Sequence, residues 1–397
     1  MPKLLQINTV ATICSTGKIA EEIGRQAIAD GWESWIAYGR GNPKSQSNLI
    51  KIGNGFDMMW HGLQTRLFDR HGLASKKATK TFIKEIKKIN PDLIHLHNIH
   101  GYYLNYPLLF RFLEEWGGPV VWTFHDCWPF TGHCTHFENY GCKRWISGCY
   151  GCPAKKEYPK SGLIDQSKRN YSEKKSCFLS LKNLTIITPS AWLKEHVKSS
   201  FLADYDCFVF TNGIDTEVFS PCHRVQDNKK TVLAVASTWT ESKGTGDLRK
   251  LNDILPEDYK LVVAGITDKQ KKHLPKGISG ITRTEDQKEL AKLYSEASVF
   301  VNPTYGDTFP TTNLEALACG TPVVTYQTGG SPEAIDKDTG RVVEKGDING
   351  LCNAILYLES LPQDALSNAC RERAVRLFDQ KDRFAEYISL YNSLLGR

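Results

Sequence analysis

The chain has 397 residues, which is more than one typical hydrophobic core accommodates and predicts about two domains. Hydrophobic residues make up 41% and charged residues 24%, as in an ordinary globular protein, and the net charge of +6 is too small to indicate nucleic-acid binding. The N-terminal apolar run is too short for a signal peptide, and no run of about eighteen apolar residues predicts a membrane-spanning helix. Without an export signal, the twelve cysteines indicate reduced thiols or a bound metal rather than disulfides.

The first half of the chain alternates short β-rich runs with helical patterns. Helical spacing is clear at 18–30, through Ile19, Ile23 and Ala27, and residues 189–193 open another helix that continues through His196 and Val197. The predicted strands lie at 4–8, 35–38, 93–97, 120–124, Leu184–Thr188 and 207–210. Such alternation predicts a parallel, doubly wound sheet.

The segment 56–88 combines large apolar side chains with basic ones. The apolar residues are Met58, Met59, Trp60, Leu63, Leu67 and Phe68, and the basic residues are Arg66, Arg70, Lys76, Lys77, Lys80 and Lys84. Such a face can rest on an anionic lipid surface or recognise a lipid-diphosphate acceptor. A solvated helical surface explains the same residues equally well, so both interpretations stay open.

Polar side chains follow the third and fourth predicted strands. His97, Asn98 and His100 come at and after the end of the third strand, and His125 and Asp126 come directly after the fourth. Doubly wound folds bind ligands at the carboxyl edge of the sheet, so His97, Asn98, His100 and Asp126 are candidates for acceptor binding. A packed loop with satisfied histidines is the alternative, and the residues alone do not exclude it.

A cysteine-rich segment follows at about 127–153. Cys134, Cys142, Cys149 and Cys152 are separated by seven, six and two residues. Four thiolates suit tetrahedral zinc, and the final Cys-x-x-Cys pair is a common half-site. We therefore predict a structural zinc ion that pins this segment and leaves no open position for water. Free thiols or a single redox pair stay open, because the first two spacings are not those of a standard zinc finger.

The chain is polar and breaks at 226–230, which we interpret as a linker. The first predicted domain is 1–222, including the cysteine-rich segment, and the second is 223–379. In the second domain we predict strands at 231–236, Tyr259–Ala264, 299–303, 322–326 and 341–343, and helices at 287–297, 351–358 and 365–395.

The stretch 305–335 reads as a loop, a helix, a strand, a turn and a second helix. Pro310 suits the first position of the helix, and Gly320 suits its end. Two carboxylates, Asp307 and Glu315, lie on either side of the helix start, whose N–H groups and dipole suit a phosphate. Acids that accept sugar hydroxyls beside a phosphate-binding helix indicate a nucleotide-sugar site.

The features of this stretch occur in the order acid, seven residues, Glu-Ala, Ala-Cys-Gly-Thr-Pro-Val-Val and Gly-Gly-x-Pro-Glu. This order resembles the signature of retaining GT-B glycosyltransferases, specifically glycosyltransferase family 4. The family usually has Glu at the first acid, where this chain has Asp307. Because six features match in fixed order, we favour this interpretation over an ordinary α/β segment with solvated acids.

The resemblance covers nearly the whole chain and implies an α/β GT-B fold, with two doubly wound Rossmann-like domains facing each other across a cleft. In the family the C-terminal helix, here about 380–397, crosses back to the first domain. The implied reaction transfers a sugar from a nucleotide-diphosphate sugar to a growing glycan, with retention of the anomeric configuration and without a catalytic metal.

The resemblance also implies roles for individual residues. Glu315 would accept the ribose hydroxyls, Asp307 would bind the donor sugar, and Lys243 would stabilise the diphosphate. His125 would orient the sugar or protonate the leaving oxygen. The other donor-side residues are Gly17 in a glycine loop, Thr238 where the family has an arginine, Arg283 beside the base, and Thr308, Phe309, Pro310 and Thr311 near the diphosphate.

The cysteine-rich loop after His-Asp is similar to that of the subgroup that resembles colanic-acid and other exopolysaccharide glycosyltransferases. This implies a lipid-linked acceptor of a bacterial surface glycan. We expect a cytoplasmic protein without a nucleic-acid partner, and peripheral contact at the inner face of the plasma membrane stays open. Two other functions also stay open: a nucleotide-sugar epimerase of similar fold, and a non-catalytic partner subunit, which the unusual residues Thr238 and Asp307 favour.

Overall fold

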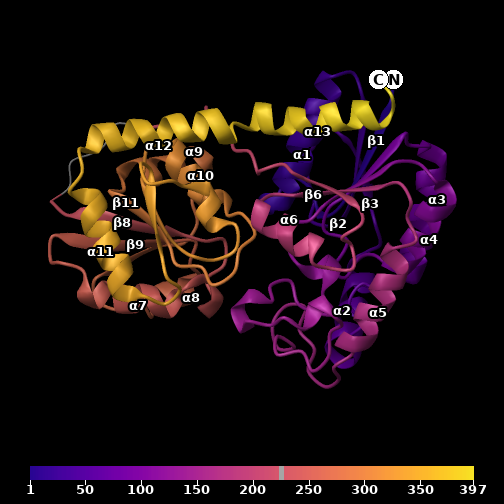
Figure 1. Ribbon diagram of the computed structural model, residues 1–397, viewed down its shortest axis with the longest axis horizontal. Helices are drawn as coiled ribbons and strands as arrows, with labels where there is room; N and C mark the ends of the chain where they lie inside the picture. The colour runs from indigo at the N-terminus through magenta and orange to yellow at the C-terminus, as the bar shows by residue number, and fades with distance from the viewer. Residues whose placement is uncertain (223–227) are drawn as a thin grey trace. The chain divides into compact units, whose positions relative to one another are not determined.

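The computed structural model describes residues 1–222 and 228–397. They form two compact units (Figure 1). Unit 1 comprises Met1–Thr211 and Arg383–Arg397, and unit 2 comprises Asn212–Asp382. The segment 212–222, which the sequence analysis assigns to the first domain, therefore belongs to unit 2. The predicted linker begins at residues that lie outside those described, and its last residue already belongs to the first strand of unit 2.

Unit 1 is built on one parallel sheet. Its strands are β1 (Lys3–Val10), β2 (Glu33–Arg40), β3 (Asn48–Lys51), β4 (Leu93–Leu96), β5 (Val120–Thr123), β6 (Leu184–Thr188) and β7 (Asp206–Val209). They are arranged in the order β3-β2-β1-β4-β5-β6-β7. All residues of β4, β5 and β6 are buried, as expected for strands covered on both faces. The sequence pattern does not predict the edge strand β3, because its residues are at most half-buried and form no apolar run.

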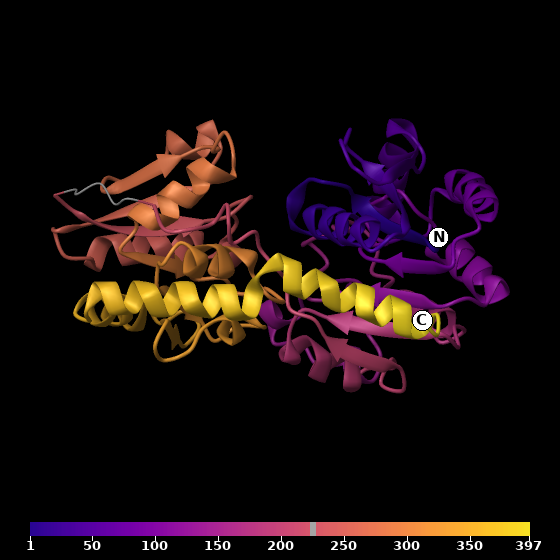
Figure 2. The ribbon, with the colours of Figure 1, turned by 90° about the horizontal axis from the view of Figure 1, so that it is seen from above.

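Helices cover both faces of this sheet. They are α1 (Cys14–Ala29), α2 (Gly55–Phe68), α3 (Lys76–Ile89), α4 (Tyr106–Trp116), α5 (Ser167–Phe178), α6 (Ala191–Lys198) and α13 (Gln380–Leu394). α13 lies across the strands of unit 1 (Figure 2), where Phe384, Tyr387, Ile388 and Tyr391 pack on residues of β1, β4, β5 and β6. No helix among the described residues is long and apolar enough to cross a lipid bilayer.

The cysteine-rich segment folds as three short 3-10 helices, η1 (Trp128–Phe130), η2 (Glu138–Tyr140) and η3 (Arg144–Ile146), joined by turns. Phe130, Phe137 and Trp145 are buried in the main core of unit 1 together with Cys134 and Cys149. The segment therefore contributes buried side chains to the hydrophobic core, while Tyr140, Ile146 and Tyr150 are exposed.

The predicted zinc site is not supported. Within residues 1–222 and 228–397, no group of three or more His, Cys, Asp or Glu side chains is arranged so that it could hold a metal ion. The four candidate ligands, Cys134, Cys142, Cys149 and Cys152, are free cysteines, and Gly132 N donates to Cys149 Sγ at 3.0 Å. Buried aromatic side chains, together with the buried Lys174 ammonium, which donates to two carbonyls of the segment at 2.7 and 2.9 Å, fix the segment instead.

Unit 2 contains a second parallel sheet. Its strands are β8 (Lys230–Val235), β9 (Tyr259–Ala264), β10 (Ile278–Ile281), β11 (Val299–Asn302), β12 (Val323–Tyr326) and β13 (Gly340–Val343), in the order β10-β9-β8-β11-β12-β13. Its helices are α7 (Thr245–Ile254), α8 (Asp268–Lys271), α9 (Gln287–Glu296), α10 (Thr311–Ala318), α11 (Ile348–Glu359) and α12 (Gln363–Phe378), with the 3-10 helices η4 (Glu241–Lys243) and η5 (Ser331–Ala334).

The C-terminal helical segment is broken at Asp379, between α12 and α13. Ile214 pairs with Asp379 in an isolated bridge. Ile214 N donates to Phe378 O at 2.9 Å, and Gln380 N donates to Ile214 O at 2.9 Å. These bonds use backbone groups that a continuous helix would pair internally, so the helix predicted at 365–395 is divided into two at Asp379.

Both sheets have the doubly wound order in which the first strand of the unit lies inside the sheet. The switch point lies between β1 and β4 in unit 1 and between β8 and β11 in unit 2. The predicted pair of Rossmann-like domains is therefore confirmed. In such folds ligands bind outside the carboxyl ends of the strands at the switch point, so a ligand is expected at the loops after these four strands.

Candidate functional site

The switch point of unit 2 brings together two of the predicted catalytic residues. Lys243 ends η4 in the loop after β8, and Asp307 lies in the loop after β11. Lys243 Nζ donates to Asp307 Oδ2 at 2.8 Å and lies 3.5 Å from Thr304 Oγ1. The two charged side chains are 33% and 23% exposed, so this ion pair is accessible to a ligand at the carboxyl edge of the sheet.

A buried carboxylate that the sequence analysis missed holds these two loops in place. Asp247 Oδ2, on α7, accepts hydrogen bonds from Tyr305 OH at 2.7 Å and from Tyr326 OH at 2.9 Å. Tyr305 N also donates to Ser242 O at 2.9 Å. Burial and the Asp247 carboxylate raise the pKa of Tyr305 to about 12, so the phenol remains a donor at neutral pH. No local pattern marks Asp247, because its partners come from a loop and a strand that are distant in the sequence.

A glycine turn holds the backbone of Asp307 from the other side. Gly329 has φ +55, and a Cβ at this position would lie 1.7 Å from Asp307 O. Gly330 N donates to the same carbonyl at 3.2 Å. Only glycine fits in so little space at a positive φ, which is the physical reason for glycine at position 329.

The N-terminus of α10 lies directly after the ion pair. The helix begins at Thr311, and Pro310 is its N-cap and not its first helical residue, which corrects the prediction. No side-chain cap hydrogen bond is formed at this helix start within the described part of the chain. The first-turn N–H groups and the helix dipole can therefore bind an anion. The side chains of Thr308, Phe309 and Pro310 are buried, so these residues offer the ligand their backbone.

Glu315 lies on the second turn of α10 and is half-buried. Its Oε2 accepts a hydrogen bond at 3.0 Å from Tyr294 OH, which belongs to a fully buried side chain of α9. Burial and the neighbouring Glu315 charge raise the pKa of Tyr294 well above its usual value, so the phenol always donates. This bond fixes the orientation of the Glu315 carboxylate.

A buried polar network joins α10 to the strands behind it. Asn302 Nδ2 donates to Asn313 Oδ1 at 2.8 Å, and Asn313 Nδ2 donates to Ser331 Oγ at 3.0 Å. Ser331 Oγ lies 2.6 Å from Thr325 Oγ1. The helix predicted here is the short 3-10 helix η5, which presents Ser331 to the network. Asn302 and Thr325 could have been predicted from the sequence, because each is a polar residue inside an otherwise apolar strand.

Two other predicted donor-side residues give weaker evidence of a role in binding the donor. Thr238 is exposed in the loop after β8 and carries no charge, so the cation that the family has there is missing. Arg283 is exposed after β10, the strand at the edge of the sheet. Lys345, which no sequence motif marks, has its Nζ 3.4 Å from Tyr305 O and places a second cation near the loop after β11.

At the switch point of unit 1, His97 and His125 are hydrogen-bonded to each other. His97 Nδ1 lies 3.0 Å from His125 Nε2, and His97 Nε2 lies 3.0 Å from Gln6 Oε1. Gln6 is itself oriented by its Nε2, which donates to Ala20 O at 2.8 Å. Because an amide oxygen only accepts, His97 carries its proton on Nε2 and accepts at Nδ1. His125 therefore donates from Nε2, and in the neutral ring its Nδ1 is an acceptor.

The lowered pKa values of His97 and His125 agree with two neutral imidazole rings. Burial lowers the pKa of His125 to about 4, although the nearby Asp126 raises it. Burial and the neighbouring His95 and His125 lower the pKa of His97 well below its usual value. The pair is therefore uncharged at neutral pH, and Gln6 sets its tautomers. The sequence analysis missed Gln6.

The other acceptor-side candidates form a second group. His100 Nε2 lies 2.8 Å from Asp126 Oδ2, and His100 Nδ1 lies 3.2 Å from Tyr158 OH. Burial alone would raise the pKa of Asp126, but His100 and the Trp128 amide lower it, so the carboxylate stays charged. Asn98 is held by its backbone, because its N–H donates to Asn8 Oδ1 at 3.3 Å. The prediction placed these residues near each other, and the structure joins His100 to Asp126 directly.

Gly17 lies in the first turn of α1 and is buried. A Cβ at this position would come within 3.2 Å of the backbone of Ala11 and Thr12. α1 begins at Cys14, four residues before the predicted start, after a turn in which Thr12 has φ 63. Gly17 therefore allows close packing of the loop on the helix.

Two doubly wound domains, with a cation, two acids and a helix N-terminus at one switch point and paired histidines at the other, define the GT-B class of glycosyltransferases. The model of "Glycosyltransferase Family 4" matches residues 17–218, and the model of "Glycosyl transferases group 1" matches residues 229–360. Since the first match covers half of the chain, the protein belongs to glycosyltransferase family 4.

Individual relatives agree with this assignment. The chain is 24% identical over 425 residues to a putative colanic acid biosynthesis glycosyl transferase, WcaC, of Escherichia coli strain K12, covering 98% of this chain and 100% of WcaC. Sucrose-phosphate synthase from Thermosynechococcus elongatus superposes with a TM-score of 0.73, at 17% identity and over 100% of both chains. Anabaena Alr3699/HepE, solved in complex with UDP and glucose, superposes with a TM-score of 0.68, at 13% identity and over 99% of this chain and 100% of HepE. The predicted family and fold class are thus confirmed.

Proposed function

We propose that the protein is a retaining hexosyltransferase that moves a sugar from a nucleotide-diphosphate donor to a lipid-linked acceptor of a bacterial surface polysaccharide. The observation that carries the proposal is the accessible Lys243–Asp307 ion pair beside the start of α10. The similarity to WcaC, a putative colanic acid biosynthesis glycosyl transferase, supports a polysaccharide product. The structure of HepE with UDP and glucose supports a nucleotide-diphosphate sugar as donor.

The diphosphate of the donor would bind at the N-terminus of α10, within reach of Lys243. Negative charge develops on the leaving diphosphate as the glycosidic bond breaks, so a lysine and a helix dipole stabilise the transition state more than the ground state. Asp307 would hold Lys243 and accept a hydrogen bond from a hydroxyl of the donor sugar. Glu315, oriented by Tyr294, would accept the ribose hydroxyls.

His125 would act on the sugar as a hydrogen-bond acceptor. Its Nε2 proton is engaged by His97, and its low pKa keeps the ring neutral. Of the two roles that the family resemblance implies, orientation of the sugar through Nδ1 fits this tautomer, and protonation of the leaving oxygen does not. His100 and Asp126 are proposed to bind the acceptor, with Tyr158 beside them.

Retention would follow if the acceptor hydroxyl attacks from the face that the nucleoside diphosphate leaves. The acceptor oxygen bonds to the anomeric carbon, the bond to the diphosphate breaks with its electron pair, and a phosphate oxygen takes the acceptor's proton. In this scheme Lys243 and α10 supply the positive charge, and no catalytic metal is needed. We also propose that the protein works in the cytoplasm at the inner face of the plasma membrane, where a lipid-linked acceptor is found.

The test is turnover of a panel of nucleotide-diphosphate sugars with a bacterial membrane lipid extract as acceptor. Release of the nucleoside diphosphate, with an unchanged anomeric configuration in the product by NMR, is the expected result. Glu315→Ala should abolish release, and Glu372→Ala, an exposed glutamate of α12, should not change it. Isomerised donor without acceptor would favour the epimerase, and donor binding without any turnover would favour the partner subunit.

A further inference from the structure

α2 in unit 1 exposes large apolar side chains to solvent. Phe56 is 69% exposed and Met59 66%, and Trp60, Leu63 and Phe68 on the same helix are also exposed. Within the 14 residues of α2 only His61 and Thr65 are buried. A helix whose apolar side chains all packed into its own core would bury such residues. Among the described residues, no part of the chain covers the apolar face of α2.

A neighbouring loop extends this apolar face. Leu163 is 72% exposed and Ile164 is 38% exposed. Gly162 N donates to Arg66 O at 2.8 Å, which fixes the loop against the last turn of α2. We name α2 together with residues 161–164 the α2 surface.

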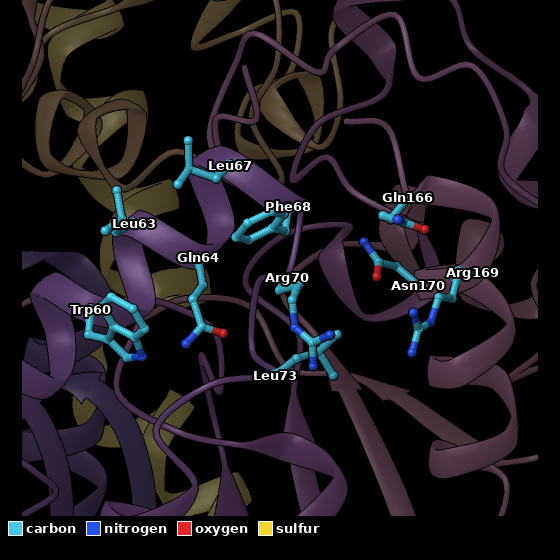
Figure 3. Close-up of a pocket in the computed structure, with 10 residues that line it drawn as sticks. All are labelled: Trp60, Leu63, Gln64, Leu67, Phe68, Arg70, Leu73, Gln166, Arg169 and Asn170. Atoms are coloured by element: carbon cyan, nitrogen blue, oxygen red, sulfur yellow. The ribbon is translucent and has the colours of Figure 1, made fainter. Parts of the chain in front are cut away.

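A cavity of about 360 Å³ opens beside α2 (Figure 3). Its walls come from α2, from the turn after it and from the start of α5, and its lining includes Trp60, Leu63, Leu67, Phe68, Arg70 and Arg169. Arg70 Nε is buried and has no hydrogen-bond partner among the described residues. One part of the cavity is therefore apolar, and another part presents the guanidinium groups of Arg70 and Arg169. The Nε–H of Arg70 is a donor that makes no hydrogen bond to the described residues.

The charges around the α2 surface are mainly positive. Arg66 on α2 is exposed, and Lys76 and Lys77 are exposed at the start of α3, which a 2.9 Å hydrogen bond between Ser75 Oγ and His61 Nδ1 places beside α2. Of the acids nearby, Asp69 is fully buried and bound to His133, Asp57 caps α2, and Glu173 lies 3.9 Å from Arg169. Asp165, the exposed acid directly after the loop, accepts hydrogen bonds from the amides of Cys152 and Ser167. Exposed apolar side chains with a basic border are typical of a helix that lies in a membrane interface.

We propose that the α2 surface docks on a lipid bilayer that contains anionic phospholipid. The apolar side chains of α2 and of the loop enter the interface, and the Arg70 and Arg169 guanidinium groups bind the phosphate of one lipid headgroup in the cavity. A second copy of the chain fits this surface poorly, because a symmetric interface would bring the same cations face to face. This docking needs no donor sugar, so it goes beyond the proposed reaction and can fail independently of it.

The test is co-sedimentation of the full chain with vesicles of phosphatidylcholine alone, or of equal parts phosphatidylcholine and phosphatidylglycerol. The wild type should sediment only with the anionic vesicles, and less at high salt. Arg70→Gln with Arg169→Gln should weaken binding about 25-fold, because each basic side chain near an anionic surface contributes a factor of about five. Trp60→Ser with Leu63→Ser should also weaken it, without loss of the folded state because both side chains are exposed.

Phe208→Ser is the matched control, since Phe208 is an exposed apolar residue of unit 1 on β7, outside the α2 surface. It should bind vesicles as the wild type does. Equal binding of the wild type and both double variants would overturn the proposal. A wild-type dimer that Trp60→Ser with Leu63→Ser converts to monomers would also overturn it, because the surface would then be a contact between copies.

Discussion

The Lys243–Asp307 ion pair is partly exposed, so it contributes at most about 1 kcal/mol to stability. Its value lies in the position of the cation at the start of α10, where a diphosphate would bring two or more negative charges. The shorter Asp307, in place of the family glutamate, still reaches Lys243 because Gly329 and Tyr305 hold its loop close to η4.

We predict that Lys243→Met lowers kcat/KM at least about 100-fold, the effect typical of removing one group that stabilises a transition-state charge. Its midpoint of thermal unfolding should fall by no more than about 4 °C. Steady-state kinetics and a thermal melt check both. Lys292→Met, on the exposed face of α9, is the control and should leave the kinetics unchanged. Wild-type kinetics in Lys243→Met would remove the lysine from the site.

Substitution of Gln6 tests whether the tautomer of His125 matters for donor binding. Gln6→Leu removes the acceptor that holds the His97 proton on Nε2, so His125 should lose its fixed acceptor at Nδ1. We expect the KM for the donor sugar to rise about tenfold, the value of one hydrogen bond, with circular dichroism unchanged. Gln6→Glu keeps an acceptor at this position and should restore donor affinity with a shifted pH profile. Equal KM values for all three proteins would show that the tautomer does not matter.

At this scale the family motif predicted Asp307 and Glu315 together, because both lie in one loop and the helix after it. Lys243 was predicted from a separate loop, 64 residues from Asp307. No motif identified Gln6 or Asp247. Gln6 meets His97 across 91 residues, and Asp247 meets Tyr326 across 79, so these pairs follow from the register of strands and loops and leave no local pattern.

At the scale of elements, buried strands with β-branched residues were predicted closely. β6 and β9 have the predicted bounds. The errors occur where side chains or turns override the pattern. α1 begins at Cys14, after a turn in which Thr12 has a positive φ, and two of the four cysteines are buried in an aromatic core, where the predicted zinc site finds no support.

Gly329→Ala is predicted to separate the loops after β11 and β12. The added Cβ would lie 1.7 Å from Asp307 O at a positive φ, so the Asp307 loop must move away from Lys243. We expect nucleoside diphosphate affinity, measured by calorimetry, to fall about tenfold or more, since positioning errors are costly at such sites.

Gly62→Ala, at a helical position where a Cβ would meet nothing within 4 Å, is the matched control. It should keep full affinity and gain slightly in stability, because alanine favours a helix over glycine. Undiminished affinity in Gly329→Ala would contradict the role assigned to the glycine turn.

At the scale of the whole molecule, unit 1 should be sensitive to acid. Burial lowers the pKa of His61 from 6.5 to about 3 and that of His125 to about 4. The unfolded chain therefore binds protons below pH 6.5 that the folded chain does not, and stability present above pH 6.5 is lost as the pH falls toward 4. Each such histidine lowers the free energy of unfolding by up to about 1.4 kcal/mol per pH unit.

Thermal melts at about pH 7 and about pH 5 test this. His61→Gln should reduce the difference between the two midpoints, because its side chain cannot titrate. His273→Gln, on the exposed surface of unit 2, should leave the difference unchanged. Identical midpoints at the two pH values would contradict the burial of neutral histidines.

We propose that the switch point of unit 2 binds a nucleoside diphosphate through α10, Lys243 and Glu315. Calorimetric titration of UDP, GDP and ADP into the wild type, Glu315→Ala and Glu372→Ala tests it most directly, because it needs no acceptor. We predict that one nucleotide binds the wild type and Glu372→Ala equally, and binds Glu315→Ala at least about tenfold more weakly. Binding that is absent from the wild type, or unchanged in Glu315→Ala, would contradict the assignment.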